Sequence, residues 1–394
     1  MTGAEMQATS EAHEVGVYAR QPLALARGRG CEVWDADGRR YLDFFAGIAV
    51  NNLGHCHPAV VEAIHRQADQ LLHVSNHYYN APLAELTALL CRISFAERVW
   101  IGNSGAEANE AAMKLVRRWG ADHGNGRYEI LSTTGSFHGR TFATLTATGQ
   151  EKYHQGYRPL LPGVKLVPFD DLAAMEAAVG PETVAIMIEP IQGEGGVNVP
   201  QPEYLTGLRA LCDRRNLLLV LDEIQTGLGR TGRLFAYESA GIVPDVMTLA
   251  KALGGGLPIG AMCTTEGLAS VFTPGAHGTT FGGNPVTCAA AVAAVTELAK
   301  PELLAHVREM GEYFRSRLDD LAHRHAIVRD IRGCGLMLGL GLEVSGAPVV
   351  ARCLADGLII NCTAERVLRM LPPLIVTRAQ IDEAVPILDR ALAA

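Results

Sequence analysis

The sequence predicts an α/β fold with a mostly parallel central sheet. Between about residues 98 and 263, short apolar segments alternate with helical patterns. Several of these segments contain Val, Ile, Leu and Met without polar alternation, which is typical of strands covered on both faces. Strands that alternate with helices form parallel sheets flanked by helices. We expect strands at 98–101, 129–131, 164–167, 184–188, 217–221, 246–249 and 259–263.

The segments before this region predict further elements. Residues 1–20 are expected to be loosely ordered. Two strand-like runs around Asp37-Gly38 predict a β-hairpin, because this dipeptide favours a tight turn. Pro58 and Pro82 stand where helices can begin, and apolar residues follow both at helical spacing.

The pattern changes after about residue 300. We expect a long helix over 301–323, strands at 335–342, 358–360 and 367–370, and a closing helix. The closing helix should begin after Thr377, which fits a capping box with Gln380. Pro386 lies inside that helix and predicts a kink.

Composition excludes several classes of function. The 394 residues are 48% hydrophobic and 19% charged, which is ordinary for a globular protein of two or three domains. The net charge is −8 and no basic patch is visible, which argues against nucleic-acid binding. The N-terminal stretch lacks the features of a signal peptide. The apolar region 286–299 is interrupted by polar residues, so it predicts a buried helix and not a membrane span. We therefore expect a cytoplasmic protein without a nucleic-acid or membrane partner.

The cysteines and histidines do not predict a metal site. Nine cysteines are scattered along the chain without a C-x-x-C pair, and we interpret them as reduced thiols. His55-Cys56-His57 has metal-binding residue types, but adjacent side chains do not converge easily on one ion. We therefore expect no metal.

Two segments at the ends of apolar strands carry charged groups. Asp222 follows the run 217–221, and ligands of open α/β sheets bind at this end of the strands. Asp222 is therefore well placed to bind a cationic group, although a helix cap or a solvated strand end would have the same pattern. Lys251 stands between the run 246–249 and three consecutive glycines. A lysine buried there needs a partner, such as an aldehyde bound as a Schiff base, but a lone lysine is more often a surface residue.

Two further segments have groups that can bind an anion or a ring. Ser104, Gly105 and Ala106 form the start of a helix, where free N–H groups attract anions, although Ser is also a common helix cap. Phe137 can stack on a planar ring and Arg140 can bind a carboxylate through two hydrogen bonds. The alternatives are a core phenylalanine and a surface arginine.

Three more positions complete the set. Glu194 lies in a Gly-rich turn. Thr279 and Thr280 provide two hydroxyl groups just before a second Gly-rich turn. Arg369 lies in an apolar run, and a buried arginine requires a carboxylate partner. That partner is either a substrate or a structural acid such as Glu194.

Together and in this order, these segments resemble the class-III pyridoxal-phosphate-dependent aminotransferases, from about Arg20 to the C-terminus. Each motif alone is weak, but six in register are specific. Within the class, the compact length and the segments 102–109, 137–140 and 279–284 are most similar to acetylornithine aminotransferases. The resemblance implies the fold type I of these transferases, with a large cofactor-binding domain over 51–290. A smaller α+β domain would combine the N-terminal segment 1–50 with the C-terminal segment 291–394.

The resemblance also implies how pyridoxal 5′-phosphate binds. Lys251 would form a Schiff base with the cofactor, and Asp222 would pair with the pyridinium nitrogen so that the ring withdraws electrons. Gln225 would hydrogen-bond near the phenolic oxygen, and Phe137 would stack on the ring. The phosphate would lie against Ser104, Gly105 and Ala106.

The remaining residues are implied in substrate binding and assembly. Thr280 would reach the phosphate from the neighbouring subunit of a homodimer with shared active sites, and Thr279 would narrow the substrate channel. The hypothesis for two substrates is that Arg140 holds the α-carboxylate of acetylornithine while Arg369 holds that of glutamate. Glu194 would pair with Arg369 and screen it while the first substrate is bound.

The implied reaction moves the terminal amine of N2-acetylornithine to 2-oxoglutarate and produces N-acetylglutamate 5-semialdehyde and glutamate, as in arginine biosynthesis. Lys251 would act as the acid and base, because burial and nearby cations lower a lysine pKa. The alternatives are ornithine, succinylornithine, succinyldiaminopimelate or 4-aminobutyrate as amine donor. An aminomutase and a non-catalytic protein of this fold are less favoured.

Overall fold

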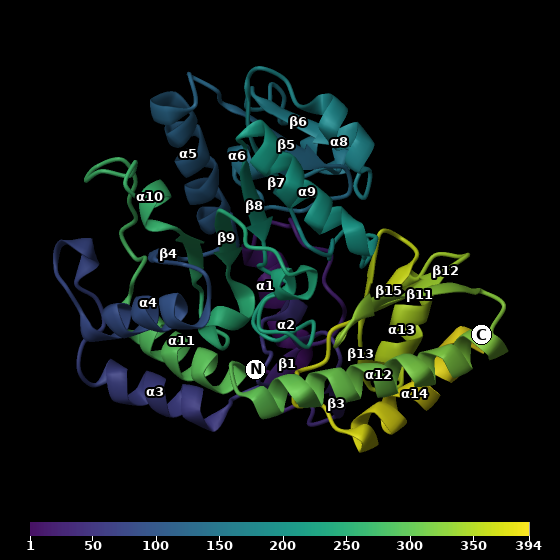
Figure 1. The fold of residues 1–394 in the computed structure, drawn as a ribbon. Helices are drawn as coiled ribbons and strands as arrows, with labels where there is room; N and C mark the ends of the chain where they lie inside the picture. Colours follow the sequence, from purple (N-terminus) through teal and green to yellow (C-terminus); the bar gives the residue numbers. More distant parts are fainter. Residues whose placement is uncertain (394) are drawn as a thin grey trace.

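A seven-stranded sheet forms the centre of the computed structural model, which describes residues 1–393 (Figure 1). In spatial order its strands are β4 (Arg98–Gly102), β10 (Gly260–Thr264), β9 (Val246–Leu249), β8 (Leu218–Asp222), β7 (Thr183–Ile188), β5 (Glu129–Thr133) and β6 (Val164–Val167). All seven predicted strands are present. β10 is antiparallel to both of its neighbours, and every other pair is parallel. The predicted mostly parallel sheet is therefore confirmed.

Helices cover both faces of this sheet, and this explains its continuous apolar strands. In β8, Val220 belongs to an apolar cluster with α5 (Gly105–His123), on one face. The adjacent Leu219 and Leu221 belong to a second cluster that includes α9 (Pro202–Arg215). Because successive side chains of a strand point to opposite faces, both faces must be apolar.

Two smaller sheets flank the central one. The first has the order β1-β2-β3-β13 and the second β11-β12-β15-β14. Their strands are β1 (Leu25–Arg29), β2 (Glu32–Asp35), β3 (Arg40–Asp43), β11 (Val328–Cys334), β12 (Met337–Leu342), β13 (Leu358–Ile359), β14 (Asn361–Thr363) and β15 (Val367–Met370). The predicted hairpin is β2–β3. β13 pairs with β3, so segments far apart in the sequence share one sheet. The expected division into two domains stays a prediction.

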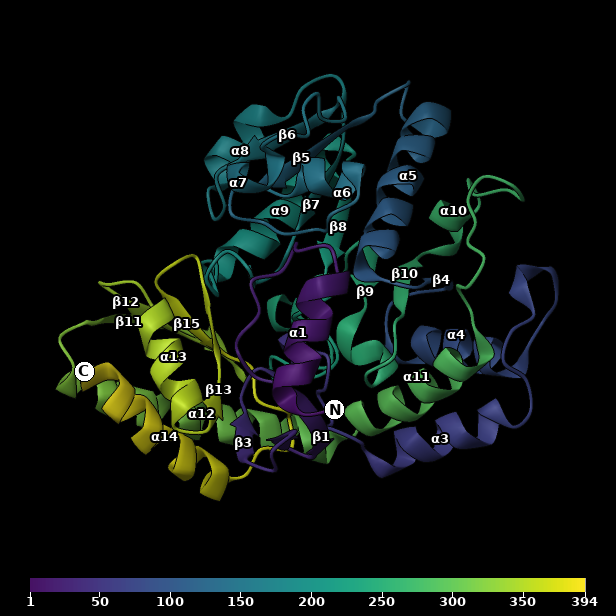
Figure 2. The same ribbon diagram turned by 180° about the vertical axis from the view of Figure 1, so that it is seen from behind.

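The remaining helices pack around these sheets (Figures 1 and 2). They are α2 (Ala46–Ala49), α3 (Pro58–Ala68), α4 (Ala81–Ile93), α6 (Phe142–Ala147), α7 (Glu151–His154), α8 (Leu172–Ala178), α10 (Glu266–Ala269), α11 (Pro285–Leu298), α12 (Pro301–Arg324), α13 (Ala347–Ala355) and α14 (Arg378–Ala393). Pro58 and Pro82 lie in the first turns of α3 and α4, as predicted. Thr377 and Gln380 form the predicted reciprocal capping bonds, and α14 continues through Pro386.

Several elements were not expected from the sequence. Residues 1–20, expected to be loosely ordered, include α1 (Gly3–His13), which has a capping box and no buried residue and lies toward the viewer in Figure 2. The strands β11 and β14 and the helix α13 were also missed. Within residues 1–393, no helix is both long and apolar enough to cross a membrane.

Candidate active site

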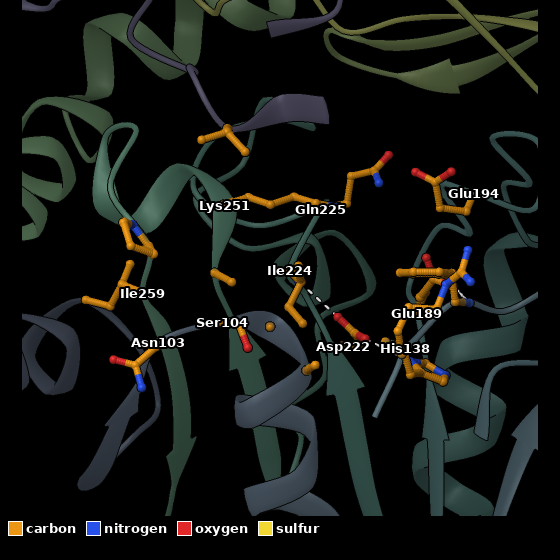
Figure 3. Close-up of a pocket in the computed structure, with 18 of the residues that line it drawn as sticks. Asn103, Ser104, His138, Glu189, Glu194, Asp222, Ile224, Gln225, Lys251 and Ile259 are labelled. Carbon is orange, nitrogen blue, oxygen red and sulfur yellow. Dashed lines mark hydrogen bonds and ion pairs between the residues drawn. The ribbon is translucent and has the colours of Figure 1, made fainter. Parts of the chain in front are cut away.

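A cavity of about 530 Å³ lies where the carboxyl ends of the central strands meet (Figure 3). Its lining comes from segments that follow β4, β5, β7, β8 and β9. Because β10 is antiparallel to both β4 and β9, these two strands run in the same direction and end at the same edge. The topology therefore gathers side chains from distant segments, as expected for an open α/β sheet.

Asp222 is the last residue of β8 and is only 3% exposed. One carboxylate oxygen accepts hydrogen bonds from Asn109 Nδ2 and pairs with His138 Nδ1, both at 2.8 Å. The other accepts the N–H of Ile224 at 3.1 Å. Asp222 is thus a buried, oriented carboxylate beside the cavity and not a solvated strand end.

His138 supports the charge of Asp222. Burial acts to lower the pKa of His138, but the hydrogen bond and charge of Asp222 prevail and raise it above its ordinary value. Its Nε2 has no hydrogen-bond partner in the described part of the chain. His138 therefore holds the Asp222 carboxylate in a fixed position beside the cavity.

Lys251 begins a short 3₁₀ helix, Lys251–Gly254, directly after β9, and its side chain reaches the cavity (Figure 3). Burial lowers the pKa of its amine; Arg369 lowers it further, while Glu194 acts in the opposite direction. Among residues 1–393, no hydrogen bond or ion pair holds this amine. Lys251 is therefore a partly desolvated amine, suited to react with a carbonyl carbon and to transfer protons.

The start of α5 and the loop after β5 form two more walls. Ser104 Oγ accepts the N–H of Glu107 at 3.2 Å, so this residue is the helix cap and also lines the cavity with Gly105 and Ala106. The first N–H groups of a helix lack partners within the helix, so this wall favours an anion. Phe137, in the loop after β5, lines another side of the cavity. Its ring packs edge-on against the ring of Tyr153, with the two ring centroids 6.0 Å apart.

The two arginines differ in their surroundings. Arg140 is exposed, and its guanidinium lies 3.7 Å from the centroid of the Tyr153 ring. No carboxylate within residues 1–393 pairs with Arg140. Arg369, on β15, is fully buried and donates through Nη1 to Glu194 at 2.6 Å and to Gln225 Oε1 at 3.2 Å.

Glu194 stands between Arg369 and the cavity. Glu194 lines the cavity, whereas Arg369 does not. Burial acts to raise the pKa of Glu194, but the charge of Arg369 prevails and lowers it. Arg369 can therefore reach a ligand in the cavity only if this carboxylate moves aside.

Sequence reasoning missed four residues of the site. Glu189 follows β7 and accepts the N–H of Phe137 at 2.8 Å, and burial raises its pKa to about 7. His138 and Asn109 stood within the segments 137–140 and 102–109 already singled out, and Glu189 directly follows the predicted strand 184–188, so their positions were a usable signal. Tyr153, in α7, offered none, because only the fold brings it to the site.

The structure does not bring Thr279 and Thr280 to this cavity. Thr279 Oγ1 accepts a hydrogen bond from Asn103 Nδ2 at 3.0 Å, and Thr280 is exposed. Neither residue lines the cavity. Their implied roles depend on a second chain and stay predictions.

Comparisons with known proteins agree with this geometry. The model of the aminotransferase class-III family matches residues 15–392. The acetylornithine aminotransferase of Caldanaerobacter subterraneus subsp. tengcongensis is 53% identical over 95% of this chain and 96% of its own length. That of Methanocaldococcus jannaschii is 49% identical over 96% and 95%. Among solved structures, the ornithine aminotransferase from Toxoplasma gondii has a TM-score of 0.97 at 34% identity, over 100% of this chain and 95% of that chain. The N-acetylornithine aminotransferase from Stenotrophomonas maltophilia has 0.85 at 38% identity, over 98% of both.

Proposed function

We propose that this chain, which belongs to the class-III aminotransferases, transfers the terminal amine of N2-acetylornithine to 2-oxoglutarate. The products would be N-acetylglutamate 5-semialdehyde and glutamate, as in arginine biosynthesis. The names of relatives that are 53% and 49% identical over nearly the whole chain support this substrate. The transamination chemistry itself is that of the family.

Class-III aminotransferases use pyridoxal 5′-phosphate, and the residues around the cavity fit this cofactor. An amine without a partner, a buried carboxylate and a helix start face the same space, and these match an aldehyde, a pyridinium nitrogen and a phosphate. A volume of about 530 Å³ is within the usual range for cofactor sites.

The proposed assignments follow from this match. Lys251 would bond the aldehyde carbon, Asp222 would hold the ring nitrogen, and Phe137 would cover one face of the ring. The N–H groups at Ser104, Gly105 and Ala106 would hold the phosphate. Gln225 would lie near the phenolic oxygen, although it already accepts a hydrogen bond from Arg369.

The cofactor, when bound, supplies an electron sink for the charge left on the substrate carbon after its proton leaves. The chain's own residues would do the rest. Lys251 would take the proton from the substrate carbon and return it, because its lowered pKa leaves its amine neutral more readily. Asp222, held by His138, would stay in place beside the ring nitrogen during this transfer.

The observation that carries the proposal is a pair of arginines beside a single cavity. Arg140 has no carboxylate partner among residues 1–393, whereas Arg369 is paired with Glu194. Arg140 is free to bind the α-carboxylate of acetylornithine. Arg369 is held by Glu194 and would bind 2-oxoglutarate or glutamate after Glu194 turns away. One site can thereby accept a donor with one free carboxylate and an acceptor with two.

We further propose a homodimer in which Thr280 completes the phosphate site of the partner subunit. The exposure of Thr280, away from the cavity of its own chain, supports this assembly. We also propose a cytoplasmic location, which is consistent with nine free cysteines in the described residues.

The test is an absorbance spectrum of the purified protein before and after addition of N-acetylornithine without 2-oxoglutarate. We expect the yellow band of the lysine-bound cofactor to disappear with acetylornithine and to return with 2-oxoglutarate. The same measurement with ornithine, N-succinylornithine, succinyldiaminopimelate and 4-aminobutyrate is the matched panel.

The outcomes separate the levels of the proposal. If another amine of the panel bleaches the band and acetylornithine does not, the substrate is wrong and the assignment of Lys251 stands. If Lys251→Ala keeps the same band, the assignment of Lys251 is wrong. An amine that is consumed without any need for 2-oxoglutarate would indicate an aminomutase.

A further inference from the structure

Another, smaller cavity lies away from the active site, and three arginines are among the residues that line it. Its volume is about 320 Å³. It lies between α12, the turn from β11 to β12, and the loop that follows Arg230. In Figure 1, α12 passes below β11 and β12 at this junction.

The charges that line this cavity do not cancel. Arg233, Arg308 and Arg315 line it, against the single carboxylate of Glu312. In a chain with a formal net charge of −8, this lining has a local charge of +2. Within residues 1–393, none of the three guanidinium groups pairs with a carboxylate, and Glu312 forms no ion pair either.

Two of these arginines are held in place by backbone carbonyls. Arg308 Nη1 donates to Gly232 O at 2.6 Å, and Arg315 Nη2 donates to Gly333 O at 2.8 Å. A guanidinium has five N–H donors, so each still has donors to offer. The side chains are therefore positioned without having their charge neutralised.

Further donors line the same space. Thr231 is only 5% exposed, and its Oγ1 has no hydrogen-bond partner among the described residues. Ser239 adds an exposed hydroxyl. Burial raises the pKa of the Cys334 thiol while the charges of Arg315 and Arg233 act to lower it.

We propose that this cavity, which we call the arginine pocket (residues 231–239, 308–315 and 333–338), binds a small dianion, either a phosphate or a dicarboxylate. A dianion would neutralise the local charge of +2 and accept hydrogen bonds from the arginines and the buried hydroxyl. The inference is independent of the substrate proposed for the active site, because no residue of the pocket lines the larger cavity.

The test is isothermal titration calorimetry of the cofactor-loaded protein with inorganic phosphate and, separately, with succinate. Ionic strength is kept constant with chloride, and the mildly alkaline pH keeps phosphate dianionic. Arg233→Gln removes one positive charge from the pocket. The Arg233 side chain is exposed and forms no hydrogen bond within residues 1–393, so the substitution breaks no contact of the fold. Glu312→Gln raises the local charge, and Arg66→Gln, at an exposed position of α3, is the matched control.

We expect Arg233→Gln to weaken binding about three- to tenfold and Glu312→Gln to tighten it about threefold, with Arg66→Gln equal to wild type. The opposite signs exclude damage to the fold as the cause, and any binding in the active site is common to all variants. The ligand that shows this pattern identifies the source as phosphate or dicarboxylate. Equal effects of the three substitutions, or no pocket-dependent binding of either anion, would overturn the proposal.

Discussion

Replacing each of the two active-site arginines should impair a different half-reaction. Arg369→Leu removes the guanidinium that we assign to 2-oxoglutarate and glutamate. Arg140→Leu removes the one that we assign to the α-carboxylate of acetylornithine. Both lie beside the same cavity, but Arg140 is exposed and unpaired whereas Arg369 is buried and bound to Glu194.

The magnitude follows from the hydrogen bonds lost. A hydrogen bond to a charged group contributes about 1.5–3 kcal/mol, and about 1.4 kcal/mol corresponds to a tenfold change in rate. Loss of one such bond from Arg369 predicts a decrease of about 10- to 150-fold in kcat/KM for 2-oxoglutarate. The acetylornithine half-reaction needs Arg369 only as the partner of Glu194, so we expect it to change less than the half-reaction of 2-oxoglutarate.

The assay is single-turnover absorbance of the bound cofactor, with each substrate added separately to the matching form of the enzyme. Arg369→Lys is a second variant, since it keeps the positive charge but loses the planar fork and should give an intermediate loss. Melting temperatures of both variants show whether the fold is retained. If Arg369→Leu and Arg140→Leu slow both half-reactions to the same extent, the division between the two arginines is wrong.

Three further predictions concern the support of the site. Tyr153→Leu removes the ring under the Arg140 guanidinium, 3.7 Å away, and should raise KM for the amine donor about two- to fivefold with little change in kcat. Gly260→Ala should weaken cofactor binding at least about tenfold, because the added Cβ would lie 2.0 Å from the carbonyl oxygen of Ser104 and displace the helix start. The raised pKa of His138 means that its ion pair stabilises the fold fully below pH 6.5 and less as pH rises through the raised value. The difference in melting temperature between wild type and His138→Asn should therefore shrink as pH rises.

Matched controls accompany these variants. Tyr153→Phe keeps the aromatic face and should behave like wild type in the KM measurement. Gly267→Ala places a methyl group where no atom lies within 4 Å and should leave cofactor affinity, measured by fluorescence titration, unchanged. A melting-temperature difference for His138→Asn that is constant with pH, or a Tyr153→Leu variant with normal KM, would contradict the corresponding argument.

The central sheet was predictable because its strands are buried on both faces. β7 and β8, for example, are fully buried and, apart from Thr183 and Asp222 at their ends, apolar, and their hydrophobic patterns identify them. The antiparallel direction of β10 was not predictable, since an apolar strand has the same composition in either direction. β11 was missed because its residues are mostly partly exposed and include three charged side chains, so it lacks an apolar pattern.

The site was predictable to the extent that its groups follow strands. Asp222 ends a buried strand, Lys251 and Glu194 follow buried strands, and the edge where parallel strands end brings them together. The supporting residues were not predictable in this way. Asn109 reaches Asp222 from the second turn of α5, and Tyr153 reaches Arg140 from α7, through contacts that depend on how the helices pack.

The backbone of Lys251 shows where function overrides local preference. Its φ is +45°, in the left-handed region that L-residues avoid and that glycine adopts without cost. Glycine is the favoured residue at such a position, and Gly255 and Gly256, which follow a few residues later, also have positive φ. A glycine at position 251 would remove the strain but also the only amine that reaches the cavity among residues 1–393. The strain, of the order of 1–2 kcal/mol, is therefore retained because the position must carry a reactive amine, and the buried β9 and the turn after it hold the residue there.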